Sequence, residues 1–568
     1  MMFLAGLAAL DVSAKPRTAN EIIAAANGVF QTSIKSKAFG LKTAPMKILR
    51  SDSQLSIAGY ADGGFVVIAN DDRFDAVLGY SDSQFDNDDL APGFVWWLEA
   101  TNASLQKRLD NGTNEEERIL PAASQRASVD ELMKTRWGQD APYNDQCPKY
   151  TQNGKQNTYV TGCVATAMAQ ILKYHAYPTS GKGSANYAFT SDVDGTIKRL
   201  TANFAKANYD YDNMLDVYTP GEYNDTQAEA VSLLMSHLGI GLKMSYTVDG
   251  SGSYLFDACR VMRKNFKANP YTEYFWASCY TKKEMMAVIY REINDNCPVL
   301  YGGVSNSGGH AFVFDGYDAR GNVHVNWGWD GQQDGFFDIT SLNGYGSQQQ
   351  MVVMRPDTDT RYAATYRSRW GLWDGASFTV KNNYGTLVAT ANGGLINIDV
   401  DAFSGNIGLI AARIDDGEQA VLAQYSVSSM AGFGPNVNGY QSSFELSGSY
   451  SSLADGEYRV YLASKGNKEA TWQPVRSSDK VSNSYIMKKV SSNASLTKEN
   501  SSDWTATTGI EGVTVVPLAA LDGTTRVYDS TGRIVYTAPT ASFSVKDVPA
   551  HGILIIKNGS LARKIVKP

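Results

Sequence analysis

The chain has 568 residues, of which 51 are Lys or Arg and 58 are Asp or Glu, for a formal net charge of −7. Because a single core rarely grows beyond roughly 250–300 residues, several domains are expected. Neither the charge nor the composition, with 43% hydrophobic residues, indicates a nucleic acid or a membrane surface as a partner. No apolar run reaches the roughly 20 residues of a spanning helix, so no transmembrane segment is predicted.

Residues 1–14 resemble the end of a secretory signal peptide. A short apolar core leads to the small residues Val12-Ser13-Ala14, which form a cleavage-site pattern before Lys15. The basic segment that normally opens such a signal is missing, so the natural start is expected upstream. The alternative is a buried N-terminal helix, against which Asp11 and the abrupt change to Lys-Pro-Arg argue.

Residues 15–107 predict a small α+β unit. A capped amphipathic helix is predicted from Thr18 to Val29, and a second helix begins near Phe94. Between the two helices, short strand patterns are bounded by turn residues, at Leu55–Tyr60, Gly64–Ala69 and Asp75–Tyr80.

The segment from Asn111 to Arg126 is polar, charged and rich in Ser and Ala, with little to bury. An ordered unit followed by an exposed linker is typical of a propeptide and its cleavage zone, which together we place at residues 15–121. The alternative is a permanent accessory domain.

The most informative stretch runs from Tyr159 to His175. Apolar residues recur at helical spacing from Cys163 onwards, and the hydroxyl of Thr161 is suited to cap the helix. Cys163 is therefore predicted in the first turn of a buried helix, where the dipole favours a thiolate by roughly 0.3–1 kcal/mol. A nucleophilic cysteine needs such a lowered pKa. Taken alone, a small apolar cysteine at a helix start is an equally good interpretation.

A second stretch favours the catalytic interpretation. Gly308 and Gly309 precede His310 and a strand-like run, and they leave the room that a substrate backbone beside the ring requires. His310 follows Cys163 by 147 residues and precedes Asn326 by 16. This is the order of a cysteine nucleophile, its imidazole base and a group that orients the imidazole.

Four motifs in this order resemble a known family. They are Trp-Gly-Gln139-Asp-Ala-Pro-Tyr-Asn, Gly-Cys163-Val-Ala-Thr-Ala, Gly-His310-Ala-Phe-Val and Asn326-Trp327-Gly-Trp329. They are similar to the motifs of the streptopain family of papain-like cysteine peptidases, and most of all to its Bacteroidetes branch, of the interpain type. The resemblance extends into residues 15–121, where a Gly-Phe-Val…Asp-Asp-Arg…Leu-Gly-Tyr-Ser pattern is similar to the family's inhibitory propeptides.

The resemblance implies a papain-like catalytic domain over residues 122–356, in which the cysteine helix faces a β half across the substrate cleft. It also implies that the side chain of Gln139 and the N–H of Cys163 stabilise the oxyanion. Asn326 lies where papain-like enzymes place the residue that orients the imidazole. In the streptopain family the neighbouring tryptophan, here Trp327, packs against the histidine, so both residues remain candidates.

The substrate is expected to contact residues around His310. The paired glycines and the neighbouring tryptophans predict an apolar subsite, and the family that the chain resembles prefers a hydrophobic side chain at the second residue before the scissile bond. The predicted substrate-binding residues are Val304, Gly308, Gly309 and Trp329.

Neither a metal nor a cofactor is implied by the remaining histidines and cysteines. His175, His237, His324 and His551 form no HExxH pattern or ligand cluster. Five cysteines is an odd number, so at least one thiol is expected to be free. Apart from Cys163, the cysteines are interpreted as structural or incidental.

Beyond the catalytic region the pattern changes to short alternating runs. These runs, separated by Gly, Asn and Ser turns, predict an immunoglobulin-like β-sandwich within residues 357–500. After a Ser- and Asn-rich tether with few expected contacts, residues 510–568 form a last compact β module. This module is similar to the C-terminal sorting domains of type IX secretion in Bacteroidetes, so the type IX secretion machinery is an expected partner.

Together these features predict an α+β protein that is a secreted or cell-surface cysteine endopeptidase, made as a zymogen. Its partners would be protein or peptide substrates and its own propeptide as inhibitor. Acyl transfer to an amine is a close variant, because the thioester chemistry is shared. The alternative is a surface adhesin or host-protein-binding protein with a vestigial peptidase domain. The intact set of Cys163, His310 and Gln139 favours the peptidase.

Overall fold

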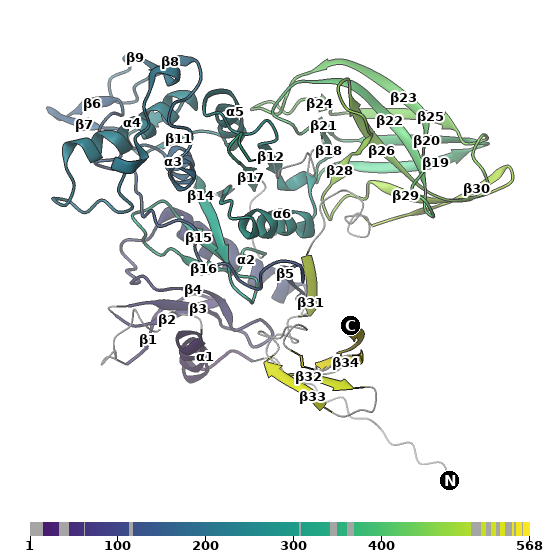
Figure 1. The fold of residues 1–568 in the computed structure, drawn as a ribbon, viewed down its shortest axis with the longest axis horizontal. Coiled ribbons are helices and arrows are strands. Elements are labelled where there is room, and N and C mark those ends of the chain that lie inside the picture. Colours follow the sequence, from purple (N-terminus) through teal and green to yellow (C-terminus); the bar gives the residue numbers. More distant parts are fainter. Residues whose placement is uncertain are drawn as a thin grey trace, which may run out of the picture.

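The computed structural model describes residues 15–32, 45–61, 63–112, 117–305, 308–340, 349–359 and 369–500, together with segments at 513–517, 524–529, 534–539, 548–549, 552–558 and 561–567. The predicted signal segment, residues 1–14, lies outside this range. Within the described range, no helix has the length and apolar character needed to span a membrane. Figure 1 shows an N-terminal α+β part, a central part with most of the helices, and two β-rich parts that follow.

One antiparallel sheet joins the N-terminal and central parts. In the described chain its ten strands lie in the order β1-β2-β3-β4-β16-β15-β14-β13-β17-β12. The two parts meet where β4 (Val77–Ser81) pairs with β16 (Gly335–Phe337), with Tyr80 opposite Phe336 and Gly79 opposite Phe337. The N-terminal part therefore extends the central sheet. Its other strands are β1 (Lys47–Ser51), β2 (Leu55–Gly59) and β3 (Phe65–Ala69).

The two predicted N-terminal helices are confirmed. α1 (Ala19–Thr32) and α2 (Pro92–Asp110) cover opposite faces of the N-terminal strands. Because successive side chains of a strand point to opposite faces, Val66 of β3 packs with α1, whereas Phe65 belongs to the main core with Trp97 of α2. Both faces of this short sheet are therefore buried.

The prediction of an exposed linker at residues 111–126 is wrong for its middle. Residues 117–121 form β5 (Glu117–Pro121), which pairs with β31 (Val513–Pro517) from the C-terminal end of the chain. Arg118 is 1% exposed, and its guanidinium lies 2.8 Å from Asp75 Oδ2 and 3.3 Å from Asp338 Oδ2. The two carboxylates allow the charge of Arg118 to be buried, because they pair with its guanidinium. Since both lie far away in the sequence, the composition of the linker does not reveal this pairing. The β31 pairing also joins the predicted C-terminal module, residues 510–568, to the N-terminal part, although few contacts were expected to hold this module.

The central part places its helices around its share of the sheet. α4 begins with a capping box formed by Asn224 and Gln227. The helices are α3 (Cys163–His175), α4 (Asp225–Gly241), α5 (Leu255–Asn265) and α6 (Lys282–Asn294). The sheet strands are β12 (Glu273–Trp276), β13 (Val299–Ser305), β14 (Gly308–Tyr317), β15 (Val323–Asn326) and β17 (Gln350–Val353). Three hairpins complete this part: β6 (Lys149–Gln152) with β7 (Lys155–Thr158), β8 (Ser184–Thr190) with β9 (Ile197–Asn203), and β10 (Ser245–Thr247) with β11 (Gly250–Gly252).

The first β-rich part, residues 369–500, has its own core of inward-facing side chains that alternate with exposed ones, as the sequence predicted. Its strands are β18 (Trp370–Leu372), β19 (Ser377–Asn383), β20 (Thr386–Asn392), β21 (Leu395–Asn397), β22 (Phe403–Arg413), β23 (Gln419–Met430), β24 (Gly439–Tyr440), β25 (Ser443–Ser449), β26 (Gly456–Gly466), β27 (Gln473–Pro474), β28 (Arg476–Ser477), β29 (Ser484–Val490) and β30 (Asn493–Lys498). A further sheet near the C-terminus contains β32 (Thr524–Asp529), β33 (Ile534–Pro539), β34 (Gly552–Asn558) and β35 (Leu561–Lys567).

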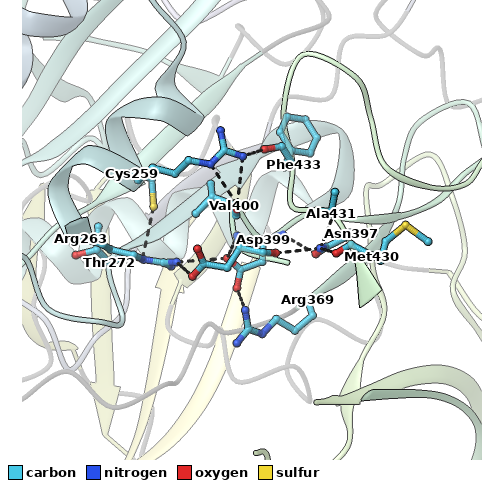
Figure 2. Close-up of polar contacts among 12 residues, drawn as sticks. Cys259, Arg263, Thr272, Arg369, Asn397, Asp399, Val400, Met430, Ala431 and Phe433 are labelled. Atoms are coloured by element: carbon cyan, nitrogen blue, oxygen red, sulfur yellow. Dashed lines mark hydrogen bonds and ion pairs between the residues drawn. The ribbon is translucent and has the colours of Figure 1, made fainter. Parts of the chain in front are cut away.

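The first β-rich part is docked on the central part through α5. The carboxylate of Asp399 lies between Arg263 of α5, at 3.4 Å, and Arg369, as Figure 2 shows. Arg260 of α5 donates hydrogen bonds to the carbonyls of Val400 and Phe433, whose side chains belong to the core of the central part. Buried ion pairs over a shared apolar core hold these parts together.

Candidate active site

The cysteine helix starts at a position that only glycine fits well. Gly162, the N-cap of α3, has φ 88°, and a Cβ there would lie 2.7 Å from the carbonyl oxygen of Ser251 in the β10–β11 hairpin. Cys163 is the first residue of α3, as predicted. The predicted cap is wrong, because the hydroxyl of Thr161 bonds to the hydroxyl of Thr166 at 2.9 Å and not to a backbone N–H.

Gln139 lies beside this helix start. Its carbonyl accepts a hydrogen bond of 3.1 Å from the N–H of Thr161, two residues before Cys163. The preceding Gly138 lies close to the Asp330 carboxylate: a Cβ at position 138 would be only 2.4 Å from Asp330 Oδ2. Local backbone contacts thus bring Gln139 to the helix entry from 24 residues upstream.

His310 lies within β14, directly opposite Gly303 of β13. Gly309 stands opposite Val304, which is 38% exposed, and the two predicted entry glycines are part of the hairpin rather than a loop before it. The strand β14, which carries His310, packs against the helix α3, which begins with Cys163. The helix that begins with Cys163 and the strand that carries His310 are therefore neighbours in the fold.

The predicted lowering of the Cys163 pKa does not hold in this structure. Burial raises the pKa of the thiol, and the backbone N–H groups of Ala311, Val164 and Cys163 offset burial only in part. Burial also lowers the pKa of His310. Both shifts favour the neutral forms of the two groups, because the loss of water outweighs the effect of the helix terminus.

Asn326 is 2% exposed, and its side-chain amide is engaged away from His310. Its Oδ1 accepts from Gln170 Nε2 at 2.9 Å and from the N–H of Gly328 at 3.0 Å, and its Nδ2 donates to the carbonyl of Thr135 at 2.8 Å. These bonds attach the end of β15 to the middle of α3. Among the described residues, no hydrogen bond joins Asn326 to the His310 ring.

Trp327 is buried against the N-terminal part. Its indole Nε1 donates to the carbonyl of Gln333 at 2.9 Å, and its ring packs against Phe312 and Phe337. A Cβ on Gly93 of α2 would lie only 2.7 Å from this ring. No ring contact between Trp327 and His310 occurs in the described part of the chain. Trp329, the predicted cleft residue, is half-buried.

α2 covers the strand that carries His310. The ring of Trp96 lies against Gly303, the residue opposite His310, where a Cβ would come within 2.6 Å of it. Trp96 also packs against Phe312, two residues after His310, with ring centroids 5.9 Å apart. The N-terminal part therefore occupies the face of β13 and β14 next to the candidate catalytic histidine.

Buried acid–base groups at the same junction were missed by the sequence reasoning. A cavity of about 270 Å³ lies between Tyr80 of β4 and the central residues His324 and Asp334. Burial raises the pKa of Asp334 to about 6 despite its 3.0 Å ion pair with Arg136. His324 and Asp334 stand alone in the sequence, with no motif around them, so the sequence does not indicate that they are buried together.

Within the described range, no group of three or more His, Cys, Asp or Glu residues is arranged to hold a metal ion. All five cysteines are free. Cys163 is half-buried, whereas the other four are buried.

Comparison with known proteins matches the two regions that meet at this site. The model of the peptidase C10 family matches residues 137–337, and that of the Spi protease inhibitor matches residues 14–105. Streptopain of Streptococcus pyogenes is 34% identical over 313 residues, which are 52% of this chain and 75% of that protein. The thiol protease/hemagglutinin PrtT of Porphyromonas gingivalis is 30% identical over 313 residues, 51% of this chain and 35% of its own length.

Two solved structures from Prevotella intermedia are also similar. A prointerpain A fragment is 37% identical and covers 54% of this chain and 97% of the fragment, with a TM-score of 0.49. Active interpain A is 38% identical and covers 41% of this chain and 97% of that chain, with a TM-score of 0.37. On the streptopain match and the two family regions, the chain belongs to the peptidase C10 family and is a streptopain-like cysteine protease with an inhibitor propeptide.

Proposed function

We propose that this protein is a secreted cysteine endopeptidase in which Cys163 is the nucleophile and His310 the general base and acid. The observation that carries the proposal is the packing of α3, which begins with Cys163, against β14, which carries His310. Cys163 attacks the peptide carbonyl, and His310 protonates the leaving amine and then activates water to hydrolyse the thioester.

Gln139 and the N–H of Cys163 would stabilise the oxyanion. Support comes from the Gln139 carbonyl, whose bond to Thr161 holds the residue beside the helix N-terminus. Removal of one oxyanion donor typically lowers kcat by about 10²–10³. The Gln139→Ala variant should therefore keep the fold and lose most of its activity.

The arrangement described above is, we propose, the inhibited state. α2 of the propeptide packs on Trp327 and on the strand of His310, and burial keeps the Cys163 thiol protonated. Removal of residues 15–121 would expose this face to water. Trp327, which would lose its contact with α2, or Asn326 would then orient His310, and the helix terminus would favour the thiolate.

Substrates would lie along the β13–β14 hairpin, where Gly308, Gly309 and the exposed Val304 leave the backbone accessible. With Trp329 at the rim, this surface favours a hydrophobic side chain at the second residue before the scissile bond. Profiling on a peptide library tests this preference, and a strict requirement for Arg or Lys there would contradict it.

We assign the domains as residues 15–121 for the propeptide, 122–356 for the papain-like catalytic domain, 357–500 for an immunoglobulin-like β-sandwich and 510–568 for a type IX sorting domain. The protein would act outside the producing cell or on its surface. Deletion of 510–568 should leave the activity of the purified protein within about twofold while retaining it inside the cell. Normal activity of the truncated protein in the medium would contradict the sorting role.

The decisive experiment is labelling of the mature protein with a peptidyl epoxide that reacts with thiols, followed by mapping of the modified residue. Modification at Cys163 alone, with matching loss of activity, is the expected result. The Cys163→Ala variant is the control and should take up no label. Labelling at another cysteine, or unchanged activity after full labelling of Cys163, would refute the assignment.

A further inference from the structure

A tyrosine stands at the tip of the β19–β20 hairpin, where its conformation is unfavourable. Asn383 pairs with Thr386, so Tyr384 and Gly385 form a two-residue turn, with φ of 47° and 89°. Such turns place both residues at positive φ and favour Asn-Gly. A bulky aromatic residue in the left-handed region is uncommon.

The side chain of Tyr384 is also fully exposed, at 102% of its reference area. Neither the turn nor the core of the β-rich part gains stability from this ring, because no residue in the described part of the chain covers it. Backbone strain of this kind is concentrated at binding and catalytic sites. Tyr384 is therefore better explained by contact with a ligand than by folding.

A cleft of about 810 Å³ adjoins this ring, a volume within the roughly 300–1,000 Å³ of small-molecule sites. Three neighbouring turns form it: the β19–β20 turn, the segment after β25 and the β29–β30 turn. Hydroxyl and amide side chains predominate in its lining, which consists of Asn382, Tyr384, Gly385, Tyr450, Ser451, Lys489, Ser491, Ser492 and Asn493.

The floor of the cleft is held in place by hydrogen bonds. Tyr450, 1% exposed, donates from its hydroxyl to Asn382 Oδ1 at 3.1 Å, and Asn382 Nδ2 donates to the carbonyl of Ala494 at 2.9 Å. Lys489 is buried, and its ammonium lies 3.1 Å from Asp455 Oδ1 and 2.7 Å from the carbonyl of Ser491. The charge of this lysine is thus balanced by Asp455, which leaves a neutral, polar and preformed surface.

We propose that this cleft is a carbohydrate-binding site, with Tyr384 as the stacking platform for a neutral sugar ring. The C–H face of a pyranose packs against an aromatic ring, and its hydroxyls exchange hydrogen bonds with the Ser and Asn side chains around it. An anionic ligand would require an unpaired cation, and an apolar ligand would require an apolar lining; the described lining residues supply neither.

The cleft lies on the β-rich part, whose strands β19, β20, β29 and β30 are on the side away from the catalytic helix α3 (Figure 1). Occupation of the cleft would therefore leave the active site free. The site would hold the peptidase on glycosylated proteins or polysaccharide surfaces while it cleaves peptide bonds there.

The test uses the full-length Cys163→Ala chain, which cannot digest itself. It is applied to an array of immobilised neutral and acidic glycans, and the best-binding neutral oligosaccharide is then titrated by calorimetry. Binding of the parent chain to neutral glycans is expected. Failure to bind any glycan on the array, or binding confined to acidic glycans, would overturn the proposal.

Two substitutions separate the ring from the turn. Tyr384→Asn supplies a residue that favours positive φ, so the variant should fold at least as stably as the parent and bind the oligosaccharide at least tenfold more weakly. Tyr384→Phe keeps the ring and should bind within about threefold of the parent, as should Tyr425→Ala, which removes an exposed tyrosine outside the cleft. Unchanged binding by Tyr384→Asn, or equal retention on a deglycosylated glycoprotein, would refute the assignment.

Discussion

The contact between Gly93 of the propeptide helix and Trp327 allows a sharp test of the inhibited state. A Cβ at Gly93 would lie 2.7 Å from the Trp327 ring, although ordinary contacts begin at 3.4 Å. The ring cannot retreat easily, because Phe312 and Phe337 pack against it and its Nε1 is hydrogen-bonded. Overpacking of this size costs roughly 1–3 kcal/mol, so Gly93→Ala should weaken propeptide docking about 5- to 150-fold.

Gly28→Ala is the matched control. Gly28 lies in α1 of the same propeptide, and a Cβ there meets nothing within 4 Å. Both substitutions favour helix formation, by up to about 1 kcal/mol, so neither should unfold the isolated propeptide. Only Gly93→Ala should oppose docking on Trp327.

The assay is the rate of self-maturation of the purified proenzyme at fixed concentration, followed by gel electrophoresis, with thermal unfolding as the check on folding. Gly93→Ala should mature faster than wild type, and Gly28→Ala should not. A folded Gly93→Ala proenzyme that matures at the wild-type rate would refute the reasoning. Equal acceleration by Gly28→Ala would show that helix propensity, and not the contact, is responsible.

Cys163→Ala should abolish casein hydrolysis and leave the precursor uncleaved when expressed alone, whereas Cys297→Ala should remain active; a hydrolytic Cys163→Ala variant would exclude the assigned nucleophile. Asp399→Ala deprives two arginines of a shared carboxylate. It should lower the free energy of unfolding by roughly 3 kcal/mol in denaturant titrations without changing kcat/KM on a short peptide. The raised pKa of Asp334, about 6 in the fold against 3.8, means that the fold binds the extra proton. The free energy of unfolding should therefore fall by up to about 3 kcal/mol as the pH rises from 4 to 6. The Asp334→Asn variant should not show this pH dependence.

The sequence by itself determined the secondary structure, because the spacing of apolar residues repeats within a few positions along the chain. Apolar spacing after Cys163 requires a helix, and the glycine before it marks its start. The alternation of apolar and polar residues predicted the β-rich part after the catalytic region. The spacing of Cys163, His310 and Asn326 indicated a cysteine peptidase, because its catalytic groups keep a characteristic order along the chain.

Only the tertiary structure decided how buried polar groups find partners. Arg118 is in a polar segment that resembles an exposed linker, yet it lies between Asp75 and Asp338, 43 and 220 residues away. The side-chain amide of Asn326 bonds to Gln170 of the cysteine helix. The position of Asn326 in the motif predicted that it orients His310, but a motif position does not reveal which partner the side chain bonds in the fold. Burial and long-range pairing set these interactions and the pKa of Cys163. They depend on which segments meet in space, which local spacing does not encode.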